Sequence, residues 1–580
     1  MKHQKGAALI VVLSLLTVSL MVGLSSMQSS QIDERLAGNY RMVMQAHMVA
    51  ETGLSVFHGA KDEMDFKEII INKFKAAESG ESLDVEGEWK NGVYGASHFN
   101  IEEVIKLDDT RFLVKSVGRS GSEDGVNNAT RVAYSYYVVE EGKSDPVFVG
   151  PIACENLNFN SDFMDSYDSR IGGYGGENSK RSFANIGVIS SEGSNVNVSR
   201  GGTKLYGNVL SRSSVNITGG GSKVIGDILA NGSVNVSGSS EVTGSIVSKG
   251  DVLLGGSTTT GGSVQSDGNV IMEGWNAVVK GDVSSGGYLN TGEGGKVEGN
   301  ARVEQSITTS GWGKRIFGFA QAENFISSGG GGLDIQVPDR EQGDIEVEPV
   351  KELASQECDV LKLADNIEPL EGLESSGSLN VNNGAYVNIS PASNGSKIKI
   401  HDKVSFMGES SSVVRLDSLD VGGGSTLEVS GGKDVILFVD GDVNVGGGSF
   451  LKITGKGTSL KIVTNGEFNQ KLDSDGLVID TETESGSNVV DDNNNPIFSL
   501  YTTDDVNISG AAKFYGSIYA PYSSVNVSAG GGFFGAMRAK ELSVEGGDGI
   551  HFDEALLDSD VGGGTEGDGA ALKLVSIVSD

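Results

Sequence analysis

Some short stretches of the sequence combine side chains that could bind a metal or transfer a proton. In the run His551-Phe552-Asp553-Glu554, a histidine is followed closely by two carboxylates. An imidazole beside carboxylates can supply metal ligands or act as a general acid or base. The same residues could instead cap the final turn of the fold through hydrogen bonds, and we favour this second interpretation.

Two other stretches are rich in carboxylate and amide oxygens, which are the ligands that calcium prefers. They are DSDG, which contains Asp473 and Asp475, and DDNNNP, which begins with Asp491 and Asp492. Neither has the ligand spacing of an EF-hand loop, and polar turns are a commoner use of such residues. We therefore expect no cofactor, and calcium is the one metal that this chemistry would allow.

The sequence lacks the motifs of common hydrolases and nucleotide-binding enzymes. It contains no G-x-S-x-G elbow, P-loop or H-E-x-x-H helix. A glycosidase needs two carboxylates across a groove, and we find no such pair with an aromatic sugar platform in a chain with 3 tryptophans. We expect no enzymatic activity. A surface protein that binds or degrades polysaccharide is the alternative.

Charge and cysteine content restrict the partners and the covalent structure. The formal net charge of -34 at pH 7 argues against nucleic-acid binding, which needs clustered lysine and arginine. Cys154 and Cys358 are the 2 cysteines of the chain, and there is no CxxC motif. If the chain is exported, they could form a disulfide or stay free, because the sequence alone does not place them within bonding distance.

A basic N-terminus precedes an uncharged apolar run from Ala7 to Leu24. This order places the N-terminus in the cytoplasm, and a run of about 18 residues can span a bilayer as a helix. No A-x-A cleavage site follows. Apolar residues instead recur every three to four positions as far as Phe57. The pattern predicts one long helix over residues 7–60, membrane-spanning in its first half and packed on a domain in its second half.

Two stretches of this predicted helix are distinctive: QKGAALIVVLSLL, and DERLAGNYRMVMQAHMVAETGL from Asp33 to Leu54. They resemble the N-terminal domain of PilX-type minor pilins of type IV pili. The resemblance implies a prepilin leader over residues 1–6, cleavage by a prepilin peptidase between Gly6 and Ala7, and N-methylation of Ala7. Major pilins carry Glu where this chain has Val11, so the resemblance implies a minor subunit. A signal anchor that is never cleaved is the plainer alternative.

Residues 61–145 change to the alternating pattern of β-strands, for example at Arg111–Lys115 and Arg131–Val138. By the same resemblance, they would form the small antiparallel sheet that packs on the helix of a pilin.

Beyond residue 145 the sequence is periodic and rich in glycine. A Gly followed by a small residue, and usually then by Val or Ile, recurs every 18 to 20 residues at Gly187, Gly207, Gly226, Gly244, Gly262, Gly281 and Gly299. Short strands with glycine corners at a fixed period predict a β-helix or solenoid. We expect a first solenoid block (146–305), an insertion or cap (306–377) with a charged helix at Val350–Asn366, a second block (378–557) and a C-terminal tail (558–580).

The second block is similar to an uncharacterised solenoid domain that is appended to PilX-type pilins, with FYGSIYAP and HFDEAL as its marks. Between the blocks lies a group with the make-up of a contact surface, or of a hydrophobic plug over the first block: Trp312, Lys314, Arg315, Phe317 and Phe319. We favour the plug.

These features predict a pilin-like fold of one long N-terminal α-helix and a small antiparallel β-sheet, followed by a mainly-β, Gly-rich solenoid in two blocks. The resemblance implies a structural minor pilin with roles in adhesion, at the tip or in assembly. Its partners would be other pilins and minor pilins, the prepilin peptidase, the inner-membrane assembly machinery and a host or environmental surface ligand.

The same resemblance implies a location. The chain would lie in the inner membrane of a Gram-negative bacterium before assembly, and afterwards in the pilus at the extracellular surface. A cytoplasmic bactofilin-like polymer is a further alternative, which the N-terminal leader disfavours.

Overall fold

The chain divides into two compact units in a computed structural model: residues 1–145 with 564–580 (unit 1), and residues 146–563 (unit 2). The structure describes residues 15, 19–21, 27, 35–36, 38–40, 42–57, 70, 73–74, 77, 81–83, 91–94, 97–107, 111–120, 129–140, 147–176, 178–182, 185–188, 194–328, 332–354, 357–391, 398–472, 476–559 and 571–579. Outside these lie the predicted leader, Gly6, Ala7, Val11, Asp473 and Asp475.

Unit 1 combines a helix over residues 42–57 with a five-stranded antiparallel sheet of order β1-β2-β3-β4-β46. The strands are β1 (Asn91–Tyr94), β2 (Ser97–Lys106), β3 (Arg111–Ser120), β4 (Ala129–Glu140) and β46 (Ala571–Ser579). The helix buries Ala50, Leu54 and Phe57 against the sheet, where the rings of Phe112 and Tyr137 stack with centroids 5.0 Å apart. Burial of this one face stabilises the helix more than its local sequence preference does.

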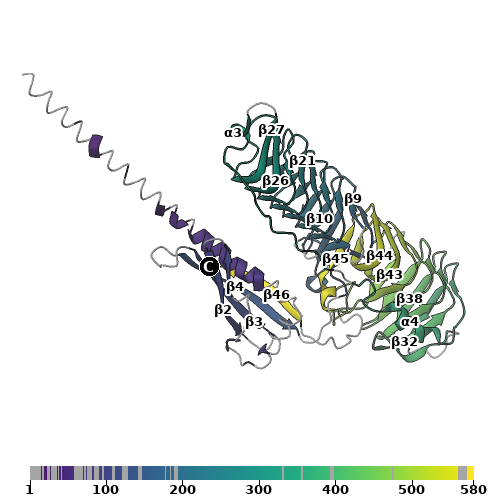
Figure 1. The fold of residues 1–580 in the computed structure, drawn as a ribbon. Coiled ribbons are helices and arrows are strands. Elements are labelled where there is room, and N and C mark those ends of the chain that lie inside the picture. Colours follow the sequence, from purple (N-terminus) through teal and green to yellow (C-terminus); the bar gives the residue numbers. More distant parts are fainter. Residues whose placement is uncertain are drawn as a thin grey trace, which may run out of the picture. The chain divides into compact units, whose positions relative to one another are not determined.

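The last strand of unit 1 comes from the far end of the chain. We expected a tail over residues 558–580, but β46 pairs antiparallel with β4, with Tyr134 facing Val578. An edge strand such as β4 presents a row of unpaired N–H and C=O groups, and β46 satisfies them. Unit 2 is therefore an insertion between two neighbouring strands of unit 1 (Figure 1).

Within the predicted membrane span at residues 7–24, the structure describes residues 15 and 19–21, and these residues are helical. Among the described residues, no helix is both long and apolar enough to cross a membrane.

Unit 2 is mainly one sheet of 37 strands, supplemented by a four-stranded sheet of order β30-β34-β37-β40. Its first part contains β5 (Ile152–Ala153), β6 (Leu157–Asn160), β7 (Phe163–Tyr167), β8 (Ile186–Val188), β9 (Val196–Val198), β10 (Lys204–Tyr206), β11 (Val209–Ser211), β12 (Val215–Ile217), β13 (Lys223–Ile225), β14 (Ile228–Ala230), β15 (Val234–Val236), β16 (Glu241–Val242), β17 (Ile246–Ser248), β18 (Val252–Gly255), β19 (Thr259–Thr260), β20 (Val264–Ser266), β21 (Val270–Glu273), β22 (Val278–Val279), β23 (Val283–Ser285), β24 (Leu289–Asn290), β25 (Lys296–Val297), β26 (Ala301–Ser310), β27 (Ala320–Ser328) and β28 (Arg340–Gln342).

Its second part contains β29 (Leu379–Val381), β30 (Tyr386–Ile389), β31 (His401–Phe406), β32 (Glu409–Leu416), β33 (Leu419–Val421), β34 (Thr426–Ser430), β35 (Asp434–Val439), β36 (Val443–Val445), β37 (Phe450–Thr454), β38 (Ser459–Thr464), β39 (Phe468–Leu472), β40 (Leu477–Asp480), β41 (Phe498–Thr502), β42 (Val506–Gly510), β43 (Phe514–Ala529), β44 (Phe533–Glu545) and β45 (Ile550–Asp553). The short helices of unit 2 are η2 (Ser169–Ile171), α3 (Gly332–Gln336), α4 (Leu363–Glu371) and η3 (Glu554–Asp558).

The strands stack in parallel, rung upon rung, at the period that the sequence predicts. Between β9 and β27 the paired residues are 18 or 19 positions apart, so that Val209 faces Ile228 and Ile228 faces Ile246. Alternate side chains of each short strand are buried, as at Val234 and Val236. The large parallel-sheet region is thus β-helix-like, with a continuous apolar core inside the stack.

The repeated Val-Asn-Val pattern has a direct structural cause. Its valines enter the core, whereas its asparagines point outward and form ladders along the stack. The Asn216 amide donates to Asn197 Oδ1, and the Asn197 amide donates to Asn158 Oδ1, each at 3.0 Å. Stacked amides of this kind hold the rungs in register.

The corners of the rungs use carboxylates in a similar way. Asp227 Oδ1 accepts the backbone N–H of Ser245 at 2.7 Å, and Asp282 Oδ1 accepts that of Asn300 at 2.7 Å. The aspartates at the Gly-Asp corners therefore accept hydrogen bonds from backbone N–H groups of the next rung. These N–H groups lie outside the strands.

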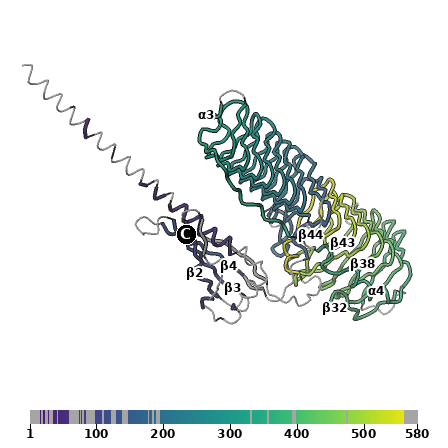
Figure 2. Tube along the Cα trace, viewed as in Figure 1, coloured from purple at the N-terminus to yellow at the C-terminus, as the bar shows by residue number. Residues whose placement is uncertain are grey.

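The two predicted blocks form one stack. The start of the first block lies against the end of the second block, although these segments are far apart in the chain. β44 pairs in parallel with β5 and β6, and β45 pairs with β7. The first rung of the first part therefore lies on the last rungs of the second part, and the C-terminal rungs lie in the middle of the stack (Figure 2). We call this contact the junction.

The boundaries of the predicted insertion differ as well. Parallel rungs continue beyond residue 305 through β26, β27 and β28. The helix α4 overlaps the predicted helix Val350–Asn366 only at residues 363–366. Residues 343–354 and 357–362, which we call the strap, are not helical. Side chains of the rungs bind the backbone of the strap: Val347 N–H donates to Glu304, Val350 N–H to Asp267 and Leu353 N–H to Asn231.

Gly118 in β3 sets how closely the helix of unit 1 approaches the sheet. A Cβ atom at this position would lie 2.1 Å from the carbonyl oxygen of Ala46 and 2.4 Å from the backbone nitrogen of Ala50. Contacts of this length force the backbone of the helix to move.

We predict that Gly118→Ala destabilises unit 1 by about 2 kcal/mol. The readout is thermal unfolding of the helix, followed by circular dichroism in detergent, because unit 2 is mainly β. Gly38→Ala is the matched control: it has no atom within 4 Å of the added methyl group, so it should leave stability unchanged or raise it. Equal melting temperatures for Gly118→Ala and the wild type would contradict the packing described here.

Candidate functional site

The helix of unit 1 carries one surface that the sheet leaves exposed. Leu36, Tyr40, Met44 and Met48 are spaced four residues apart and have 67, 68, 40 and 58% of their surface exposed. Side chains at this spacing lie on one face of a helix. We call this set the outer stripe. Large apolar residues exposed in a row mark a surface that contacts another molecule.

The predicted apolar face of this helix is buried only in its later part. We expected Leu36 and Tyr40 on the same face as Ala50, Leu54 and Phe57. The last three are buried against the sheet, whereas Leu36 and Tyr40 are exposed.

His551, the histidine that we expected in a metal site or a cap, is buried at the junction. Its Nδ1 lies 2.6 Å from Asp165 Oδ1, and its ring lies against Phe534 and Tyr174, with centroids 4.5 and 4.1 Å apart. Asp165 also accepts hydrogen bonds from the Tyr174 hydroxyl and the Lys180 N–H. The cap was predicted for a final turn, but this rung is covered by β7.

The two carboxylates that follow His551 also hold the junction together. Glu554 accepts from Arg181 at 2.6 and 2.7 Å and from the Ser166 hydroxyl at 2.8 Å. Asp553 Oδ1 accepts the N–H of Ser169 at 3.0 Å and that of Ala555 at 3.2 Å. Apart from the local bond between Ala555 and Asp553, these bonds join residues more than 370 positions apart in the chain, so the cluster supports a structural role.

Two arginines bind the segments by which the chain enters and leaves unit 2. Arg170 pairs with Asp168 at 2.8 Å and with Asp558 at 2.5 Å. Burial acts to raise the pKa of Asp168, but the hydrogen bonds from Arg170 outweigh it and lower that pKa. Arg538 donates to the carbonyl oxygen of Val147 at 3.0 Å.

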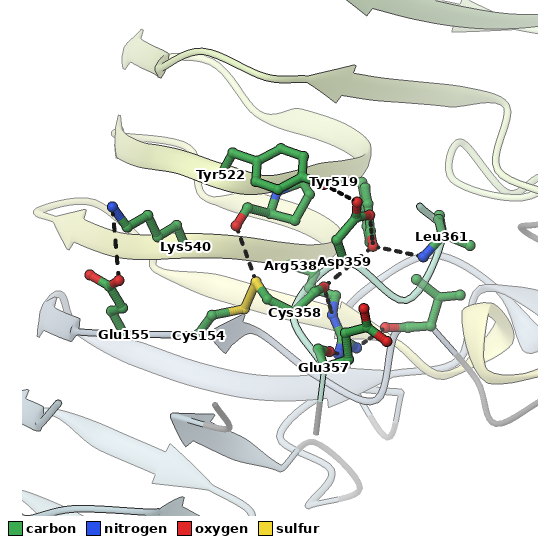
Figure 3. The surroundings of a disulfide bond; sticks show 12 residues. Cys154, Glu155, Glu357, Cys358, Asp359, Leu361, Tyr519, Tyr522, Arg538 and Lys540 are labelled. Carbon is green, nitrogen blue, oxygen red and sulfur yellow. Dashed lines mark hydrogen bonds and ion pairs between the residues drawn. A yellow bond between two sulfur atoms is a disulfide. The ribbon is translucent and has the colours of Figure 1, made fainter. Parts of the chain in front are cut away.

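A disulfide between Cys154 and Cys358 attaches the strap to the first rung (Figure 3). The Cα atoms are 5.7 Å apart, within the usual range for this bond. Arg538 also donates to the carbonyl oxygens of Cys358 and Glu357, at 2.9 and 2.6 Å. Asp359 accepts a hydrogen bond from the hydroxyl of Tyr519 at 2.9 Å and another from that of Tyr522. The strap is thus fixed at the junction by covalent and polar contacts.

The predicted calcium ligands that the structure describes are used by the protein itself. Asp491 Oδ1 accepts the N–H groups of Asn493 and Asn495, each at 2.9 Å. Asp492 accepts the N–H of Glu484 at 2.7 Å and lies 3.6 Å from Lys456. Within the described ranges, no group of three or more His, Cys, Asp and Glu side chains is arranged to hold a metal ion.

The aromatic group between the blocks does not form the plug that we favoured. Trp312, Phe317 and Phe319 have 81, 47 and 37% of their surface exposed. Lys314 lies over the ring of Phe317, and Arg315 is buried and donates to the carbonyl oxygens of Ser310 and Glu293. The core position in this segment is filled by Ile316.

Comparison with known proteins bears on the helix and on the second part of unit 2. Residues 5–55 match the family model described as PilX N-terminal. In its N-terminal segment the chain is type IV pilin-like, and it carries a large inserted domain, unit 2. Residues 413–559 of this pilin-like protein match a domain of unknown function (DUF7305).

One solved structure that the comparison finds is the competence-associated pilin ComZ from Thermus thermophilus. It is 10% identical, with a TM-score of 0.21, over 93% of this chain and 97% of that chain. A TM-score of this size carries no argument about the fold. A search of the curated proteins finds no match.

We predict that the double substitution Cys154→Ser with Cys358→Ser lowers the free energy of unfolding of unit 2 by about 2–4 kcal/mol, because the bond closes a long loop. The measurement is denaturant unfolding with and without dithiothreitol. The reductant should destabilise the wild type by the same amount and leave the double variant unchanged. A wild type insensitive to the reductant, with both thiols shown to be free, would contradict this prediction.

A second prediction concerns pH. Burial raises the pKa of Asp553 from 3.8 to about 6. The folded state therefore binds more protons than the unfolded state between these values, so this group stabilises the fold below pH 3.8 and loses that effect as pH rises to 6. The shift corresponds to about 3 kcal/mol. Asp553→Asn should lack this dependence, so the stability of the wild type relative to the variant should fall as pH rises from 4 to 7. For Asp334→Asn, whose side chain is 92% exposed, the corresponding difference should stay constant over this range.

Proposed function

We propose that the chain is a minor pilin that enters or primes a type IV pilus and displays unit 2 on it. The match of residues 5–55 to the PilX N-terminal family carries this proposal. The outer stripe supports it, because a helix in the core of a filament needs an apolar face for its neighbours in addition to the face that packs on its own sheet. The partners would be other pilins and minor pilins.

The proposal includes a path from the membrane to the surface. A prepilin peptidase would cut between Gly6 and Ala7, the new amine of Ala7 would be methylated, and the inner-membrane machinery of a Gram-negative bacterium would move the helix from lipid into the filament. Major pilins carry a glutamate at the position of Val11. The absence of this carboxylate would fit a minor subunit.

The insertion of unit 2 between β4 and β46 supports a role in display. Some 400 residues are added without interrupting the helix or the order of β1 to β4. An addition of this size would crowd a helical lattice if every subunit carried it, which favours the tip and a role in adhesion or assembly. We propose no enzymatic activity for the chain.

A membrane-anchored protein that binds or degrades polysaccharide is the second candidate, and the β-helix-like architecture favours it. The two candidates differ in their need for processing. Activity on a glycan that persists when Gly6 is replaced would favour the anchored protein.

The test of the proposal is mass spectrometry of sheared pili. We expect a mature N-terminus at N-methylated Ala7, and loss of the protein from the pilus fraction when Gly6 is replaced by Val. Ser26→Val, which leaves the cleavage site intact, is the control for membrane insertion. Recovery of the intact residues 1–6 on protein that stays in the membrane fraction would contradict the proposal.

A further inference from the structure

A polar pocket of about 570 Å³ lies in the second part of unit 2. Its walls are the β31–β32 hairpin, the turns that precede β35 and β38, and the loop from Asp491 to Pro496. Among the described pairs of the 37-stranded sheet, β31–β32 is the antiparallel one, which lets this hairpin stand beside the rungs. The volume falls within the range of small-molecule sites, roughly 300–1,000 Å³.

The lining of this pocket combines uncharged polar side chains with charged ones. It has few apolar residues, among them Met407 and Pro496. The uncharged polar residues are Ser410, Ser411, Ser412, Ser459, Ser499, Asn493, Asn495 and Tyr501. Several of them stand on strands held rigidly by the stack, which preorganises their hydrogen-bonding groups. A ligand complementary to such a wall is itself rich in hydroxyl groups.

The carboxylates of the lining already have donors within the protein. Glu409 pairs with Lys461, and Asp434 accepts from the Ser459 hydroxyl. Asp402 accepts from the Ser412 hydroxyl at 3.0 Å. Asp491 accepts two backbone N–H groups, as described above. Lys461 neutralises Glu409, and the hydrogen bonds hold the other three carboxylates in fixed positions on the wall.

The lysines at the rim of the pocket differ from these carboxylates in their contacts. Lys403 and Lys433 line the pocket and are exposed, and within the part of the chain that the structure describes neither makes an ion pair. The net charge of the protein is -34, but at physiological ionic strength exposed charges are screened beyond about 8 Å. The two ammonium groups are therefore the local positive charges that could hold an anionic group of a ligand at the rim.

Ser411 supplies an independent sign of a missing partner. It is 4% exposed, lines the pocket, and its hydroxyl has no hydrogen-bond partner among the described residues. A buried hydroxyl without a partner is unfavourable, and a ligand hydroxyl or carboxylate in the pocket would satisfy it.

We propose that this pocket binds an acidic saccharide, with the anionic group of the sugar between Lys403 and Lys433 and a sugar oxygen at the Ser411 hydroxyl. The proposal deepens the display role and rests on it for its biological purpose, since it names the class of surface ligand that the pilin-like protein would meet. The binding step itself uses only residues of unit 2.

The test is calorimetric titration of the full-length protein in detergent with trigalacturonic acid. We expect saturable binding, no binding of the neutral trisaccharide maltotriose, and no displacement by inorganic phosphate at equal concentration. Lys403→Gln with Lys433→Gln should weaken binding at least ten-fold. The matched control, Lys280→Gln with Lys296→Gln, removes two exposed lysines of the first part and should bind as the wild type does.

Ser411→Ala separates binding from folding. Because its hydroxyl lacks a hydrogen bond, the substitution should leave the melting temperature unchanged, and it should weaken saccharide binding about five-fold. Wild-type affinity in the Lys403/Lys433 variant, equal affinity for maltotriose, or full displacement by phosphate would each overturn the proposal. A Gly6→Val protein should bind as the wild type does, so loss of pilus incorporation and loss of saccharide binding are separate outcomes.

Discussion

In unit 2, rungs that are about 385 residues apart in the chain lie on each other. The physical constraint behind this contact is the open edge of a parallel stack, which leaves a row of N–H and C=O groups ready to pair with another chain. β44 and β45 cover the edge of β5, β6 and β7, and they leave no free edge in the middle of the stack. The buried cluster at His551, the path of the strap and the disulfide all depend on this junction.

The sequence predicted those features of the fold that depend on residues close together in the chain. Alternation of Val and Asn predicted which residues are buried, and the glycine period predicted the rung length. It was insufficient for the junction, because a period specifies the spacing of neighbours but not which edges meet. The same reason explains β46, which was expected in a tail. Its partner β4 is more than 430 residues away along the chain.

Polar residues were the harder part of the candidate site. His551, Asp491 and Asp492 have the residue types of a metal or acid-base site, but each has a structural use that comes from residues distant in the chain or from nearby backbone. A charged helix was predicted at Val350–Asn366, and the strap forms the first part of this range. The strap is not helical because Asn231, Asp267 and Glu304 accept hydrogen bonds from its backbone N–H groups, which a helix would need for its own hydrogen bonds. The pocket beside β32 had no signal in the sequence, because its lining comes from four separate segments.

The position of the junction has a mechanical consequence. The chain enters unit 2 next to Val147 and leaves it next to Asp558, and both residues bind arginines of the central rungs. A solenoid held by a terminal rung would unfold under tension one rung at a time, starting from that end. Here tension transmitted through the two connecting segments would load neighbouring central rungs in shear, where several hydrogen bonds must break together. A domain attached in this way is suited to hold a ligand under pulling force, and the two outermost rungs would carry little of the load.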